Sequence, residues 1–181
     1  MTIEQKNAQV MRDLHACYVE TGLTPLESKP EGLLCVAAEL PYENNRILVS
    51  SVYHADMELA ESSIYFGLIP KEKRLRVVQL INEINSYLMC EHFTLHTDNG
   101  LLLFRSGIYV PKYFLDKSHL KLGLQQLLAK SYEFFPLIDE VLFYKKNPQL
   151  VMQRYLRRRE KRMMEIEEHE KEKKTVPQGL Q

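Results

Sequence analysis

The chain has 181 residues, of which 45% are hydrophobic, and its 24 basic and 24 acidic residues cancel to a formal net charge of zero. This length suits one folded domain with an appendage, and it allows a core without metal or disulfide support. The neutral balance argues against nucleic acid or an anionic membrane as the obligatory partner of the whole body.

The cysteines and the N-terminus indicate the cellular compartment in which the protein is expected. Cys17, Cys35 and Cys90 lie far apart and form no CxxC pair, which favours reduced thiols over a disulfide scaffold. Residues 1–6 lack the apolar core of a signal peptide. No window approaches the roughly 20 apolar residues that a membrane span needs. We therefore expect a soluble, cytoplasmic protein with no membrane partner.

One helix and three strands are expected first. Apolar residues recur near one helical face over residues 3–20, Gly22 follows as a stop, and residues 23–31 contain two prolines that indicate a loop. The strand patterns cover residues 32–40, 46–54 and 58–68. The segments between them are too short for a crossover helix, so these strands are predicted to pair antiparallel as a meander.

The third strand predicts a sheet that is covered on one side. Its apolar residues share one face and its polar residues Glu61 and Ser63 point the other way. The apolar set is Ala60, Ile64, Phe66 and Leu68.

The second strand is apolar on both faces. Ile47, Val49 and Tyr53 lie on one face, and Leu48 and Val52 lie on the other. Two or three helices cannot cover both faces, so some apolar surface is expected to remain for a partner.

Residues 70–110 carry the clearest local signal. Apolar residues between Arg74 and Met89 follow the helical period, and Pro70 suits the first helical turn. Residues 93–96 then alternate, residues 98–100 read Asp-Asn-Gly, and residues 101–104 resume an apolar run. A helix followed by a hairpin is predicted.

The remaining pattern is helical and changes character after Asn147. An apolar stripe runs from His119 to Leu142 and resumes in phase after Pro136, which predicts a kink rather than a division of the helix. A charged helix follows, and its apolar residues have heptad-like spacing that Arg159 interrupts. These apolar residues are Met152, Leu156, Met163 and Ile166.

The expected architecture is α+β, with an antiparallel sheet of about five strands and helices packed on it in the order α-β-β-β-α-β-β-α. We assign residues 1–146 to this domain, residues 147–174 to a charged helical extension and residues 175–181 to a disordered tail.

Three stretches of the domain resemble the YbjN family of bacterial regulators, whose fold is similar to that of type III secretion chaperones. They are the helix at 78–85, the strand pair at 93–96 and 101–105, and the segment 132–138. The element order agrees up to about Lys145. The resemblance implies binding to peptide segments of other proteins, homodimer formation and no enzymatic activity. The charged helix lies outside it.

Metal-ligand residue types share one face of the predicted strand after Met89, namely Cys90, His92 and His96. Residues four apart on a strand are separated by roughly 13 Å, so His92 and His96 cannot both reach one zinc ion. An exposed polar face is the favoured interpretation and a metal site is the alternative. No cofactor or metal is predicted.

Asn82 and Asn85 lie within the apolar helix before this strand. A buried Asn usually pairs with backbone groups of a neighbouring element, because unpaired burial costs about 1–3 kcal/mol. Asn85 lies nearer the apolar stripe and is expected to be a structural contact, with a ligand role as the alternative.

No Ser-His-Asp order, phosphate loop, HExxH or paired-carboxylate motif is present, which favours a non-enzymatic protein over an unrecognised enzyme. We predict a protein-binding module, chaperone-like or regulatory, that forms a homodimer. The alternative is a nucleic-acid-associated regulatory factor that uses the Arg-rich helix, although the acidic run there invites intrahelical pairs such as Lys161 with Glu165. The predicted partner-binding residues are Leu48, Val52, Tyr53, Arg154, Arg157, Arg158 and Arg162.

Overall fold

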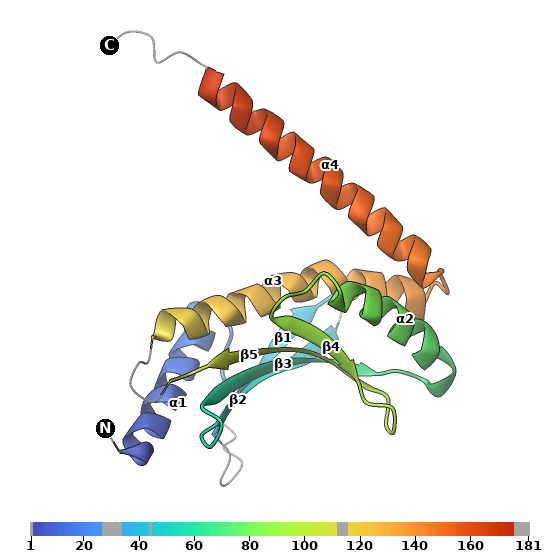
Figure 1. Ribbon diagram of the computed structural model, residues 1–181. Helices are drawn as coiled ribbons and strands as arrows, with labels where there is room; N and C mark the ends of the chain where they lie inside the picture. Colours follow the sequence, from blue (N-terminus) through green and yellow to red (C-terminus); the bar gives the residue numbers. More distant parts are fainter. Residues whose placement is uncertain (1, 27–33, 44, 112–115, 176–181) are drawn as a thin grey trace.

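The computed structural model describes residues 2–26, 34–43, 45–111 and 116–175, with side chains up to Lys171. The rest of the predicted loop (27–31) and of the predicted tail (176–181) lies outside the described residues. The elements, shown in Figure 1, are α1 (Ile3–Glu20), β1 (Cys35–Tyr42), β2 (Asn45–His54), β3 (Leu59–Leu68), the 3-10 turn η1 (Lys71–Lys73), α2 (Arg74–Asn85), β4 (Glu91–Leu95), β5 (Leu101–Tyr109), α3 (Lys117–Leu142) and α4 (Pro148–Thr175).

The five strands form one sheet in the order β1-β2-β3-β5-β4, and every neighbouring pair is antiparallel. The predicted meander is therefore confirmed for β1, β2 and β3. The predicted hairpin of β4 and β5 joins the meander through β5. Its turn needs glycine, because Gly100 has a φ of 82° and an added Cβ would lie 2.5 Å from the carbonyl oxygen of Ile69.

A β-bulge in β3 corrects the predicted face of Leu68. The register shifts between Tyr65 and Gly67, which leaves Phe66 as the additional residue opposite β5. One extra residue inverts the alternation beyond it. Phe66 still packs against the core ring of Phe135, with ring centroids 5.0 Å apart, whereas Leu68 is 69% exposed instead of sharing the covered face.

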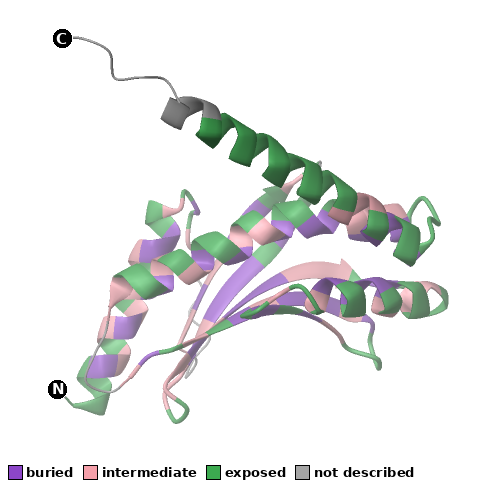
Figure 2. Ribbon diagram, turned by 45° about the horizontal axis from the view of Figure 1, so that its top comes forward, coloured by how far each residue is buried: buried purple, intermediate pink, exposed green. Residues whose placement is uncertain are grey.

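The helices pack on one face of the sheet, as Figures 1 and 2 show from two directions. Helix α3 crosses the sheet, α1 packs beside it over β1 and β2, and α2 lies along β4. A buried chain of hydroxyls fixes α1, since the Tyr18 hydroxyl lies 2.9 Å from Ser51 Oγ, which lies 2.6 Å from Ser62 Oγ. Burial raises the pKa of Tyr18. Because each of these three hydroxyls has a hydrogen-bond partner, their burial is compatible with a stable fold.

Helix α3 continues through Pro136, so the alternative of a divided helix is wrong. Proline removes one helical hydrogen bond and leaves the carbonyl of the residue four positions earlier without its donor. That residue is Tyr132, and both it and Pro136 are exposed. Water can therefore satisfy the free carbonyl while the apolar stripe stays in phase.

Asn85 fastens the end of α2 to the outer edge of β4. Its side-chain Nδ2 donates to the carbonyl oxygen of Phe93 at 3.0 Å, and its Oδ1 accepts from the Phe93 N–H at 2.7 Å. The amide thus takes the place of a further strand at this point of the edge. The expectation that Asn85 is a structural contact is confirmed, whereas Asn82 is exposed.

The first turns of α4 belong to the core of the body. Val151 and Met152 are buried in the same cluster as the residues of α3 and the sheet, and Tyr155 and Leu156 pack against it. The division between residues 146 and 147 stays a prediction, but a truncation at that point would expose core side chains.

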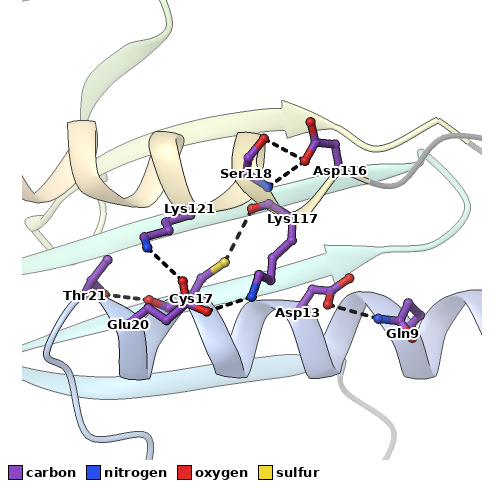
Figure 3. A network of polar contacts seen from close by, with 9 residues as sticks. All are labelled: Gln9, Asp13, Cys17, Glu20, Thr21, Asp116, Lys117, Ser118 and Lys121. Carbon is purple, nitrogen blue, oxygen red and sulfur yellow. Dashed lines mark hydrogen bonds and ion pairs between the residues drawn. The ribbon is translucent and has the colours of Figure 1, made fainter.

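Helices α1 and α3 are joined by the ionic contacts shown in Figure 3. Glu20 accepts from Lys117 at 2.7 Å and from Lys121 at 2.8 Å. These two hydrogen bonds lower the pKa of Glu20 from 4.5 to about 2. Cys17 lies beneath them and donates to the carbonyl oxygen of Lys117 at 3.7 Å, and burial raises its pKa to about 11. The thiol therefore stays protonated at neutral pH and is a poor nucleophile.

Replacing Glu20 by glutamine is expected to lower the melting temperature at pH 7. A carboxylate with a depressed pKa stabilises the fold fully above its unfolded value of 4.5, and this contribution disappears as the pH falls through about 2. The difference from the unmodified chain should thus shrink below pH 4.5 in thermal melts followed by circular dichroism. Glu83→Gln, at an exposed site, is the control. A pH-independent difference would contradict the ionic assignment.

Candidate functional site

The sheet has one face on which none of the described helices packs, and we call it the open face. The antiparallel register sets its composition. Leu48 lies opposite Tyr65, and Val52 lies opposite Glu61. Leu48 and Val52 are two residues either side of Ser50 on β2, so they share this face, as the alternation predicts. Leu48 is 37% exposed and Val52 is half-buried.

Several polar groups of the open face are paired with one another. Arg105 of β5 forms an ion pair with Glu61 of β3 at 2.5 Å and also donates to Ser63 Oγ at 3.4 Å. On β2, Ser50 Oγ donates to the Tyr65 hydroxyl at 3.4 Å. The face therefore combines half-exposed apolar side chains with a neutralised charge pair. Such a composition resembles that of protein interfaces rather than that of an anion or cation site.

Tyr53 does not belong to this surface. It alternates onto the helix-covered face with Ile47 and Val49 and is only 3% exposed. The Lys6 ammonium lies 5.9 Å from the centroid of its ring. The predicted partner-binding residues on β2 are therefore reduced to Leu48 and Val52. The alternation of side chains along the strand already placed Tyr53 on the opposite face from these two residues.

The four predicted arginines have different surroundings. Arg154 is half-buried and paired with Glu140, which also accepts from Lys146 at 3.0 Å. Partial burial on its own would raise the pKa of Glu140, but its contacts with Lys146 and Arg154 lower this pKa below its usual value. Arg157, Arg158 and Arg162 are exposed, and no hydrogen bond or ion pair joins them to another described residue. Arg154 is thus a structural contact between α3 and α4.

The predicted binding residues lie on opposite sides of the molecule. Figure 1 shows α4 rising from the end of α3 on the side away from the sheet. Leu48 and Val52 belong to the open face, which is the surface of the sheet turned away from the helices. Arg158 and Arg162 line a groove between α4 and α3, together with Tyr132 and Leu137 of α3. These two groups cannot form a single site.

Several residues of these surfaces were not predicted. Tyr65 and Arg105 join the open face only through the cross-strand register, and Tyr132 and Leu137 face α4 only because α4 folds back over α3. Alternation within β3 indicates the face of Tyr65, but nothing local to the sequence names its neighbours.

The polar face of β4 contains no metal centre. Cys90, His92 and His96 are all exposed. Across the described part of the chain, no cluster of three or more His, Cys, Asp or Glu residues could hold a metal ion. None of the described helices combines the length and the hydropathy that crossing a bilayer requires.

No protein-family model matches the chain, and no curated protein is a recognisable relative. Three solved structures are similar. A chain of the ExsC–ExsE complex has a TM-score of 0.52 and 16% identity, over 73% of this chain and 95% of that one. A chain of the HopA1–SchA chaperone–effector complex has a TM-score of 0.45 and 16% identity, over 71% of this chain and 94% of that one. A chain of the structure of the Yersinia pestis type III secretion chaperone SycH with a fragment of YscM2 has a TM-score of 0.43 and 15% identity, over 68% of this chain and 97% of that one.

The first of these likenesses is one of fold. It confirms the predicted α+β class, a five-stranded antiparallel sheet with helices packed on it. Membership of the YbjN family stays a prediction.

Proposed function

We propose that this protein is a non-enzymatic, chaperone-like module that binds a segment of another protein on the open face of its sheet. The observation that carries the proposal is the position of Leu48 and Val52, which are incompletely buried on a face that no described helix covers. Apolar side chains left in this state on a broad surface typically mark an interaction site.

The fold adds support of a different kind. A protein with the same fold was solved as a complex with a second protein, ExsE. The neutral Glu61–Arg105 pair suits a partner that contributes apolar side chains and backbone rather than one bound through net charge. We extend the proposal to a cytoplasmic homodimer of the YbjN type, in which residues 1–146 bind and residues 147–174 form an extension.

The test replaces Leu48 and Val52 together by glutamate. Two buried carboxylates in an apolar contact would weaken binding at least about tenfold, since each unpaired charge costs several kcal/mol. Proteins captured by the unmodified chain from its native cytoplasm are identified, and the affinity of the recovered partner is then measured for each variant. Leu122→Glu, at an exposed site on α3, is the matched control.

Circular dichroism melts establish that the double variant is folded. If the folded variant keeps the affinity of the unmodified chain, the open face is not the binding site. If only Leu122→Glu weakens binding, the site lies on the helical side.

A second candidate function is nucleic-acid binding by α4. Arg157, Arg158 and Arg162 favour it because they are exposed without a described carboxylate partner. The same helix continues with Glu165, Glu167, Glu168 and Glu170, which would repel phosphate. RNA and DNA titrations at two salt concentrations decide between the candidates, because true phosphate contacts weaken steeply with salt.

A further inference from the structure

The distal half of α4 is exposed to solvent along its whole described length. From Arg157 to Lys171 every residue is exposed, and Figures 1 and 2 show this part of the helix projecting away from the body. Isolated helices gain little stability in water, and most helical stability comes from packing of an amphipathic face. The pattern of side chains on this segment therefore indicates which partner could stabilise it.

One stripe of α4 has the spacing of a coiled-coil seam. Intervals of four and three residues alternate along it, which is the heptad pattern. Its members are Met152, Leu156, Arg159, Met163, Ile166 and Glu170. The first two pack against the body, whereas Met163 and Ile166 are each 53% exposed. The face that begins as a core contact thus continues into solvent with the same apolar character.

The charges on α4 are separated along its length. The segment 154–162 contains six basic residues and one acidic residue, and the segment 163–170 contains four acidic residues and no Lys or Arg. Lys161 and Glu165 form an ion pair between the two segments at 3.7 Å, and both side chains are exposed. Such a helix is complementary to a second copy of itself that runs in the opposite direction, but not to a parallel copy.

We propose that two copies of this chain associate through antiparallel pairing of α4, with the centre of the contact between residues 164 and 165. In this register Met163 packs against Ile166 of the partner subunit, and Ile166 packs against Met163 of the partner subunit. The next layer outward joins Arg159 to Glu170 of the partner subunit. The two charged residues that interrupt the seam are then paired with each other.

A parallel pair would be unfavourable at both of these layers. Arg159 would face Arg159 of the partner subunit, and Glu170 would face Glu170 of the partner subunit. Like charges that face each other at seam positions destabilise a coiled coil. The antiparallel register also sets Glu160 near Glu167 of the partner subunit, twice by symmetry, but these exposed residues flank the seam, where solvent screens like charges. The proposal deepens the homodimer part of the proposed function and does not involve the open face.

Charge reversal in the full-length chain tests the register. Arg159→Glu sets glutamate against Glu170 of the partner subunit, and Glu170→Arg sets arginine against Arg159 of the partner subunit. Each change is expected to raise the self-association Kd by at least about tenfold. Combining both changes in one chain restores the opposite-charge layer and should return the Kd to within about threefold. Sedimentation velocity over a concentration series provides the measurement.

A mixture of the two single variants and a pair of control variants test whether the effect is specific to residues 159 and 170. An equimolar mixture of the two single variants should dimerise, because every charged layer then joins opposite charges. Lys161→Glu and Glu168→Arg make the same charge changes on the side of α4 opposite the seam, and they should leave the Kd unchanged.

The unmodified chain is expected to approach twice the 21.3 kDa of one copy at high concentration. A strict monomer would overturn the proposal, and so would a double variant that stays as weak as the single variants, since residues 159 and 170 would then not face each other across the dimer. If both single variants keep the dimer, the contact lies elsewhere on the chain. None of these outcomes depends on partner binding at Leu48 and Val52, so the two proposals fail separately.

Discussion

Replacing Phe135 by alanine is expected to lower the free energy of unfolding by about 3–5 kcal/mol, the range typical for buried Phe→Ala changes. Phe135 is fully buried in α3, and its ring lies 5.5 Å from Tyr42, 5.0 Å from Phe66, 6.1 Å from Phe93 and 6.4 Å from Phe104. One side chain therefore joins α3 to four of the five strands. Chemical denaturation followed by circular dichroism measures the loss.

Two further variants serve as comparisons for Phe135→Ala. Phe135→Leu keeps most of the volume and should cost less than the alanine change, because a smaller cavity remains. Leu122→Ala, at a half-exposed site on the same helix, should cost under about 1 kcal/mol. If Phe135→Ala were no more damaging than Leu122→Ala, α3 would not be held to the sheet through this ring.

Replacing Asn85 by alanine is expected to cost about 2–3 kcal/mol. The change removes both hydrogen bonds to Phe93 and leaves its backbone N–H and carbonyl without partners in a part-buried environment. Hydrogen exchange of the Phe93 amide should accelerate more than exchange in β2, because the loss is local to the β4 edge. Asn82→Ala, at an exposed site three residues earlier on α2, is the matched control.

The two roles considered for Asn85 give opposite results in this experiment. A structural contact lowers the melting temperature before any binding changes. A variant that kept its melting temperature but lost partner binding would instead indicate a ligand role.

Local periodicity was sufficient for most of the fold. Helix α1 begins and ends where the stripe predicts, and the strand patterns lie within a few residues of β1, β2 and β3. These predictions succeed because the apolar period and the turn residues act within one element. The errors occur where residues from distant elements meet. Leu68, for example, changes face because a bulge forms against β5.

By itself, the sequence determined the order of the elements, which residues of β2 share a face, the continuation of the stripe through Pro136 and the uneven charge of α4. These properties follow from the spacing of side chains along the chain. Only the tertiary structure decided that β5 lies beside β3, that Asn85 meets Phe93, and that Leu48 and α4 lie on opposite sides of the molecule. Each of these contacts joins separate elements, and which elements meet depends on how the whole set buries its apolar faces together.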